Sequence, residues 1–287
     1  MKTQSKLAMD KLAGLASEKP HSEAEIMRLS EELAWVERRG LASVFIDWVE
    51  KIDALKGQGV LVGPGRGSIG GSYLAWSTGL TEINPQKLGL SQLLFLRDDR
   101  SELTFHFDVS RRSLSREEGL YFDEALSRIA SARVIAGGRP REAEISNASI
   151  MDRLKKGWHH LDPSISSEAT EMLKKMPPQM EAPLELSLAL SRPGPQQSEM
   201  TATFLSGEAD EKFTQLWPET NGVPVYLEQW LSLSSDSLRD PRVLELQKRW
   251  RHYGYIRSHA IGRSRIGWYA AEMARWAPDA WARVSAN

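Results

Sequence analysis

The sequence predicts an α+β fold in which helices outnumber short, buried strands. Apolar residues recur at helical spacing through residues 22–39 and again through 41–57. Two strand patterns follow: a compact apolar run at residues 60–62, and an alternation of apolar and polar residues over 102–110. With 287 residues, of which 41% are hydrophobic, the chain can form one large domain or two modest ones.

The composition excludes several classes of protein. The formal net charge is −1, so there is no overall basic field, and any nucleic-acid-binding surface must be local. The chain has no cysteine, which excludes disulfides and thiolate zinc sites. No apolar run has transmembrane length, and residues 1–19 lack the apolar core of a signal peptide. We therefore expect a cytoplasmic protein.

The first elements are predicted from local signals. Residues 1–21 are polar, and we expect them to form a flexible N-terminal arm. Ser22 and Glu25 have the spacing of a capping box, which predicts that a helix begins here. A second helix is predicted to end at Gly57. The apolar faces of the two helices are expected to pack in the core; they consist of Ile26, Leu29, Leu33 and Val36 in the first, and Leu41, Val44, Phe45, Trp48, Val49, Ile52 and Leu55 in the second.

A glycine-rich segment, residues 63–72, follows the first expected strand and precedes a helix-like run at 73–76. Its five glycines permit positive φ angles and a close approach of the backbone to a ligand. A helix N-terminus offers unpaired N–H groups and a partial positive charge. The order strand, glycine loop, helix therefore predicts a phosphate site, to which Arg66, Ser68 and Ser72 can add donors.

The loop residues alone leave three interpretations open. A P-loop would require a lysine, and this loop has none. Gly65, Gly67 and Gly70 match the dinucleotide fingerprint, but Glu82 comes too early to be its acidic residue. The third interpretation is a glycine-rich turn that binds no ligand.

The alternating segment 102–110 predicts a half-buried strand. Leu103, Phe105, Phe107 and Val109 would form its apolar face, and Glu102, Thr104, His106, Asp108 and Ser110 its polar face. Carboxylates on such a face can hold Mg²⁺, which prefers oxygen ligands. Taken alone, Asp108 fits better as an ordinary polar position on an exposed strand face.

From residue 28 to residue 108 the chain resembles the start of the catalytic core of the bacterial DNA polymerase III alpha subunit, a family C DNA polymerase. The resemblance runs through the loop at 62–72, through 80–85, and through the strand that ends at Ser110. It returns in family order: residues 188–198 resemble ALFRPGPLQSG, 225–229 VYQEQ, 253–260 YGFNKSHA and 275–281 KAHYPAEF. It covers residues 28–110 and 184–283.

This resemblance implies a nucleotidyltransferase-type, polymerase-beta-like palm followed by a mostly helical fingers region. We expect a palm-like domain over residues 22–177 and a fingers-like helical domain over 178–287, divided at Pro177-Pro178. Only residues 111–143 lie where the family inserts the thumb that grips the product duplex. We therefore expect the thumb to be largely absent.

The resemblance assigns catalysis to Asp108 and Glu144, and metal binding to Asp108, Glu144 and His106. The implied metal is Mg²⁺ or Mn²⁺. The acidic strand motif of the family is incomplete here, because His106 replaces its first carboxylate and Ser110 its last. Histidine suits Mn²⁺ better than Mg²⁺.

The resemblance assigns nucleotide binding to Arg66, Gly67, Ser68, Ser72, Arg192, Arg257, Ser258 and His259. Arg192 precedes a rigid Pro-Gly-Pro turn, which can hold a guanidinium against a phosphate. One dense basic run, interleaved with aromatic residues, predicts DNA contacts by Arg249, Arg251, Arg263 and Arg265. The same run also fits a solvated helix face.

Two functions remain open. The first is a template-directed DNA polymerase of a phage or mobile element, which transfers a nucleotide from a dNTP to a primer 3′ hydroxyl during DNA replication. Its partners would be primer–template DNA, dNTP and a second replication protein that supplies the missing grip. The second is a polymerase-derived protein without catalysis that binds DNA, nucleotide or a replisome partner. The glycine loop and the fingers motifs favour the first, and the incomplete acidic motif favours the second. Nothing after residue 100 supports a third function, a dinucleotide-dependent enzyme. Of the three we favour the polymerase.

Overall fold

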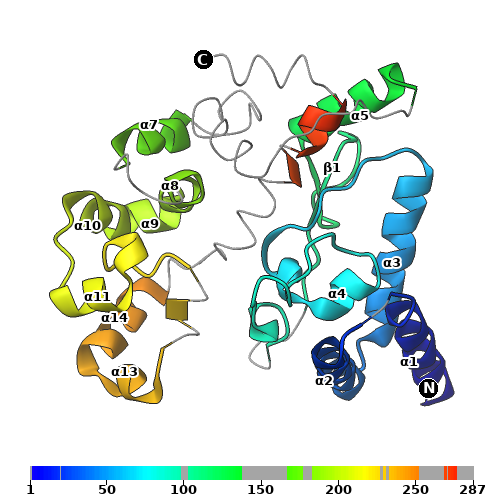
Figure 1. The fold of residues 1–287 in the computed structure, drawn as a ribbon, viewed down its shortest axis with the longest axis horizontal. Helices are drawn as coiled ribbons and strands as arrows, with labels where there is room; N and C mark the ends of the chain where they lie inside the picture. Colours follow the sequence, from blue (N-terminus) through cyan, green and yellow to red (C-terminus); the bar gives the residue numbers. More distant parts are fainter. Residues whose placement is uncertain are drawn as a thin grey trace. The chain divides into compact units, whose positions relative to one another are not determined.

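The computed structural model describes residues 2–19, 21–97, 103–137, 167–176, 183–226, 229–230, 233–251, 268–269 and 271–276. Within these ranges the protein is mostly helical, with one two-stranded parallel sheet, which is compatible with the predicted α+β class (Figure 1). No helix in the described ranges is both long and apolar enough to cross a membrane.

The chain divides into two compact units. The first comprises Met1–Ile150 and Ser264–Arg283, and the second comprises Met151–Arg263 and Val284–Asn287. The expected boundary at residues 177–178 thus lies inside the second unit. Residues 264–283, which we expected in a fingers-like domain, group with the first unit.

Residues 2–16, expected to belong to a flexible arm, form helix α1 (Lys2–Ala16). Leu12 and Ala16 are one helical turn apart on the same face, and both are fully buried. Helix α1 contacts α3 (Ala42–Gly57), so it is part of the core of the first unit.

Helix α2 (Glu23–Arg39) begins at the predicted capping box. The Ser22 side chain accepts a hydrogen bond from the Glu25 backbone, and the Glu25 carboxylate accepts one from the Ser22 N–H at 2.8 Å. The helix ends at Gly40, whose φ of 65° is left-handed. Its buried face is shorter than predicted, because Leu29 and Val36 are buried whereas Ile26 is exposed.

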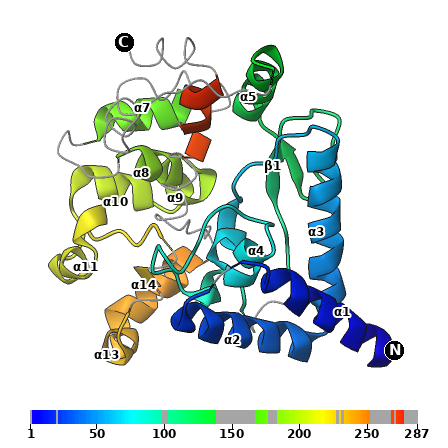
Figure 2. The same cartoon turned by 45° about the vertical axis from the view of Figure 1, so that its right-hand side comes forward.

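The sheet consists of β1 (Phe107–Val109) and β2 (Leu120–Phe122), with Asp108 opposite Tyr121. The strand predicted over 102–110 is therefore only three residues long. The strand predicted at 60–62 is reduced to one antiparallel bridge between Val62 and Val109. Helix α3 lies beside β1 in both views (Figures 1 and 2), and Trp48 of α3 stacks on Phe105 with ring centroids 5.4 Å apart.

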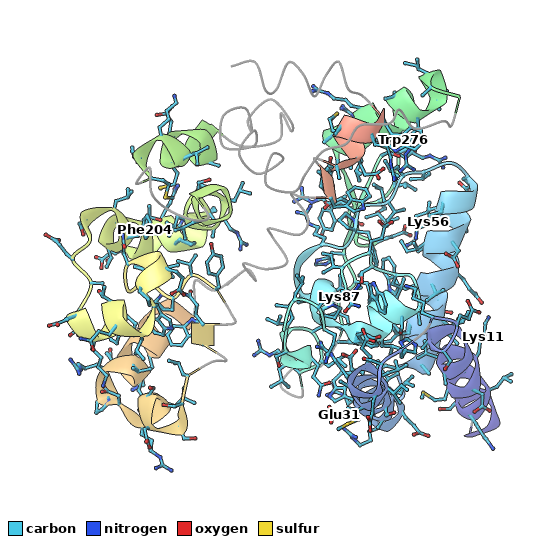
Figure 3. All side chains as sticks on the ribbon, in the orientation of Figure 1. Lys11, Glu31, Lys56, Lys87, Phe204 and Trp276 are labelled. Atoms are coloured by element: carbon cyan, nitrogen blue, oxygen red, sulfur yellow. The ribbon has the colours of Figure 1, made fainter. Side chains whose placement is uncertain are left out.

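The remaining elements of the first unit are short, apart from one helix. They are the 3₁₀ helices η1 (Gly67–Gly71) and η2 (Gln92–Leu94), and the α-helices α4 (Tyr73–Ser77) and α5 (Glu124–Ile135). Residues 268–269 and 271–276 are also helical. Trp276 lies beside α5 (Figure 3), where the Arg133 guanidinium is 4.8 Å from the centre of its ring.

The second unit is built from helices packed around Trp217 and Phe204, which are 2% and 1% exposed (Phe204 is labelled in Figure 3). The first of these helices in the chain is α7 (Ser167–Lys175). The other helices are α8 (Pro183–Leu190), α9 (Pro193–Gln197), α10 (Met200–Ser206), α11 (Glu211–Leu216), η4 (Pro218–Thr220), α13 (Ser235–Arg239) and α14 (Pro241–Arg251).

Candidate functional site

Backbone pairing places the start of the glycine loop directly beside Asp108. The Gly63 N–H donates to the Asp108 carbonyl oxygen at 2.8 Å, and the Ser110 N–H donates to the Leu61 carbonyl oxygen at 2.9 Å. These bonds flank the Val62–Val109 bridge. The loop predicted to bind phosphate and the strand predicted to carry a carboxylate therefore form one local structure.

The loop has a buried part and an exposed tip. Gly65 has a φ of 131°, and a Cβ atom there would lie 3.1 Å from the Thr81 side chain. A Cβ atom at Gly71 would lie 2.7 Å from Cβ of Leu94, so this glycine permits close packing. Only residues 66–68 of the loop reach solvent.

The exposed tip carries donors that suit an anion. Gly67 has a φ of 67°, and a Cβ atom there would meet no other atom within 4 Å. No described residue accepts a hydrogen bond from the backbone N–H of Gly67 or Ser68. The tip therefore combines the Arg66 side chain with two N–H groups that have no acceptor among the described residues.

Arg66 folds back from the tip onto the strand. Its Nη1 donates to Oδ1 of Asp108, and its guanidinium lies 4.4 Å from the centre of the Tyr121 ring. Asp108 is 2% exposed, so the prediction of an exposed polar face at this position is wrong. The carboxylate is buried because Val62 and Tyr121 flank its strand, and Arg66 covers it.

The two residues that flank Asp108 in the expected acidic motif have structural partners. The His106 ring lies edge-on to Tyr121, with centroids 5.3 Å apart. Burial lowers the pKa of His106, the Arg66 guanidinium lowers it further, and Asp108 partly opposes the shift. The Ser110 Oγ accepts a hydrogen bond from the Leu61 N–H at 2.9 Å.

Ser72, predicted to bind nucleotide, is fully buried. Its hydroxyl donates to Oε2 of Glu32 at 2.8 Å, and the same carboxylate accepts the backbone N–H groups of Tyr73 at 2.9 Å and Leu74 at 3.0 Å. Arg28 donates to Glu32 from the other side, at 3.1 Å. A buried glutamate thus occupies the start of α4, and the described geometry does not offer Ser72 to a nucleotide.

Sequence reasoning missed Glu32, although a signal was present. Glu32 lies between Leu29 and Val36 on the apolar face of α2, where an unpaired charge would be costly. Such a position indicates a buried partner. Here the partners are the donors at the start of α4.

Sequence reasoning also missed a contact between Tyr269 and Asp123. The Tyr269 hydroxyl donates to Oδ2 of Asp123 at 2.9 Å, while Oδ1 accepts the Leu126 N–H at 3.0 Å and caps α5. The same hydroxyl lies 3.4 Å from the place that a Cβ atom at Gly63 would occupy. No local signal predicts this contact, because 146 positions separate the two residues.

The described residues do not supply the donor set of a two-metal site. Asp108 is one of the two carboxylates predicted to bind metal, and its Oδ1 is paired with Arg66. The described ranges contain no group of three or more His, Asp or Glu residues suited to a metal ion. Glu144 lies outside these ranges. Two-metal chemistry needs carboxylates that bridge two ions, and of the two carboxylates predicted here only Asp108 lies in the described ranges.

Of the other predicted residues, Arg192, Arg249 and Arg251 lie in the second unit. Arg192 is the N-cap residue of α9, with the extended φ of −75° and ψ of 151° that its Pro-Gly-Pro sequence favours. The backbone of Arg249 and Arg251 lies on α14. Outside the described residues lie Arg257, Ser258, His259, Arg263 and Arg265.

Comparisons with known proteins agree with one another. The family described as bacterial DNA polymerase III alpha NTPase domain matches residues 2–133, and the finger domain of the same subunit matches residues 123–238. DNA polymerase III subunit alpha of Thermus aquaticus is 40% identical over 79 residues, 28% of this chain and 6% of the relative.

Two longer matches have the same name. The subunit of Caulobacter vibrioides is 34% identical over 129 residues, 45% of this chain and 11% of the relative. That of Saccharopolyspora erythraea is 31% identical over 158 residues, 54% of this chain and 12% of the relative. The matched segments thus span about a tenth of the length of these relatives.

Proposed function

Because this chain belongs to the family of the bacterial DNA polymerase III alpha subunit, we propose that it is a DNA-replication protein that binds the phosphate groups of a nucleotide on its glycine loop. The observation that carries this proposal is the geometry of the loop tip. Arg66 is partly exposed and anchored only at its far end, and the N–H groups of Gly67 and Ser68 face no described acceptor.

The chemistry of the tip suits a phosphate. A guanidinium presents a fork of N–H donors that matches phosphate oxygens, and hydrogen bonds to a charged group are the stronger ones. Two adjacent backbone N–H groups add donors that need no reorganisation. A triphosphate carries more negative charge than the single carboxylate of Asp108, so it can draw Arg66 from the closed pair to the bound nucleotide.

A second candidate is template-directed DNA polymerisation, favoured by the position of Asp108 directly beside the loop. In this proposal the first unit is a nucleotidyltransferase palm, and Glu144 adds its carboxylate to that of Asp108 with Mg²⁺ or Mn²⁺. Arg192, Arg257, Ser258 and His259 assist the nucleotide, and Arg249, Arg251, Arg263 and Arg265 contact primer–template DNA. A second replication protein supplies grip, in the cytoplasm of a bacterium or a phage-infected cell.

Nucleotide binding is tested first, with a fluorescent dNTP followed by anisotropy. Arg66→Ala should weaken binding about 10- to 100-fold, the loss expected for one charged hydrogen bond worth about 1.5–3 kcal/mol. Arg116→Ala is the matched control, because Arg116 also lies over the Tyr121 ring, at 5.5 Å, but is not paired with Asp108. Equal affinity of the Arg66→Ala variant and the parent would refute the proposed role of the loop.

Catalysis is tested by primer extension with Mg²⁺ and Mn²⁺ in parallel. Extension by the parent that Asp108→Asn abolishes, with circular dichroism unchanged, supports the polymerase. Nucleotide binding without extension in either metal supports a protein that binds but does not polymerise. A trap that allows one binding event per primer then tests the need for a second protein, since an unaided chain without a thumb should add few nucleotides.

A further inference from the structure

A groove of about 710 Å³ lies on the first unit, where the chain leaves β1 and passes α5. Its polar lining consists of three arginines and three serines: Ser110, Arg111, Arg112, Ser127, Arg128 and Ser131. None of the described residues that line it is acidic. The groove is therefore basic in a chain whose net charge is only −1.

Neutral groups hold two of the arginines in place. Arg111 donates to the side-chain oxygen of Gln58 at 2.9 Å and to its carbonyl oxygen at 3.4 Å. The Arg112 guanidinium lies 4.6 Å from the centre of the Phe122 ring. These partners are a neutral amide, a carbonyl oxygen and an aromatic ring, so they orient the two guanidinium groups without neutralising their charge.

The third arginine comes from another element. Arg128 is exposed on α5, and Ser127 and Ser131 line the groove from the same helix. The α5 residues that line the groove run from 127 to 135, which corresponds to about 12 Å of helix. The groove thus extends along α5, and its three cations come from two separate segments of the chain.

We infer that this groove binds the phosphodiester backbone of a nucleic-acid strand. Phosphates on one strand follow one another about every 3.4 Å along the helix axis, so about 12 Å accommodates roughly three of them. Arginine and serine side chains are typical phosphate ligands, and they position a strand without reading its sequence. This inference rests on the proposed role in DNA replication, and it assigns strand binding to a place separate from the loop tip.

The test is the binding of a labelled 20-nucleotide strand and a labelled 20-base-pair duplex, without dNTP or metal, between 50 and 200 mM KCl. The variant is the triple substitution Arg111→Gln, Arg112→Gln and Arg128→Gln. Each lost phosphate contact reduces the slope of log affinity against log salt by about 0.7 for single strands and about 0.9 for duplex. We expect the slope to become shallower by about 2 and by about 3, respectively.

A matched triple variant removes the same total charge elsewhere on the first unit. It carries Lys6→Gln, Arg38→Gln and Lys87→Gln, all at exposed positions (Lys87 is labelled in Figure 3). This control should keep the slope of the parent. Equal changes in the two triple variants, or a parent that binds neither nucleic acid, would overturn the inference. An acidic peptide that displaces the labelled strand as well as an unlabelled strand does would also overturn the inference.

Two further measurements separate this inference from the proposed function. The single variant Arg128→Glu, at an exposed position of α5, should weaken strand binding even if the triple variant folds poorly. The groove variants should keep the dNTP affinity of the parent, and Arg66→Ala should keep its salt slope for strands. Groove variants that lose dNTP affinity would contradict the role of the loop. A groove triple variant that keeps both the salt slope and the dNTP affinity of the parent would contradict the role of the groove. Groove variants that lose affinity for pyrophosphate but not for strands would show a site for free phosphates and contradict the inference.

Discussion

Arg66 and Asp108 form an ion pair between the loop tip and β1, in which the carboxylate side chain is 1% exposed and the guanidinium side chain 37%. The two partners therefore differ in burial, and the two single substitutions should have different effects. Removal of the arginine leaves a buried charge without its cation, whereas Asp108→Asn removes the charge itself and keeps the shape.

The first prediction follows from this asymmetry. Arg66→Met should lower the free energy of unfolding by about 1–3 kcal/mol, because it removes a charged hydrogen bond from a buried carboxylate. The double variant Arg66→Met/Asp108→Asn should be more stable than the sum of the two single changes implies. Urea denaturation of the four proteins measures this coupling. Additive effects would mean that the two side chains do not interact in solution.

The second prediction concerns pH. Burial and the Arg66 guanidinium lower the pKa of His106 from its ordinary value of 6.5. Near this value the unfolded chain therefore binds a proton more readily than the folded protein does. The stability due to neutral His106 is fully present above about pH 6.5 and is lost as pH falls through the folded-state pKa.

The free energy of unfolding should thus decrease between pH 7 and pH 5, and it should decrease less in His106→Gln. Urea denaturation at each pH gives the two curves, and NMR titration of the His106 ring gives the pKa directly. Parallel curves for the parent and the variant would show that other groups cause the dependence.

The third prediction concerns Glu32. A glutamine there would face the donors of Ser72, Tyr73 and Leu74 with one oxygen and an NH₂ group that cannot accept. Glu32→Gln should lower the free energy of unfolding by about 2–3 kcal/mol. Glu37→Gln on the exposed side of the same helix should change it by less than about 0.5 kcal/mol. Similar losses in both variants would contradict the buried network.

The fourth prediction concerns Gly119, which leads into β2 with a φ of 78°. A Cβ atom there would collide with the carbonyl oxygen of Phe105, so Gly119→Ala should cost about 2–4 kcal/mol. Gly89→Ala is the control: its φ is 63° but a Cβ atom there meets nothing within 4 Å, so only the backbone term of about 1–2 kcal/mol applies. Thermal unfolding measures the stability of the two variants. Equal losses of stability would show that the backbone shifts to relieve the collision at residue 119.

Features governed by neighbouring residues were predictable from the sequence. The capping box at Ser22 and Glu25 and the end of α3 at Gly57 depend on residues a few positions apart. The length of a strand depends instead on its partner. The alternation over 102–110 continues beyond β1, but the pairing with β2 ends after three residues, so the prediction was too long.

The candidate site was predictable only as far as the loop and Asp108. Their proximity follows from chain order, but the burial of Asp108 depends on Arg66 and Tyr121, which approach it from two other segments. The basic groove has no local signal either. Arg111 and Arg112 are separated from Arg128 by a segment that contains Glu117 and Glu118, and only the fold brings the arginines to one groove.

The hydrogen bond between Tyr269 and Asp123 has a consequence for synthesis of the protein. A ribosome adds about 5–20 residues per second, so the tyrosine follows the aspartate, 146 positions earlier, after roughly 7–30 seconds. During this interval residues 151–263 of the second unit are synthesised, while Asp123 still lacks the tyrosine that lies beside the start of the glycine loop. The first unit therefore gains this contact only after most of the second unit has been made, and a nascent chain halted before residue 269 carries the loop without it.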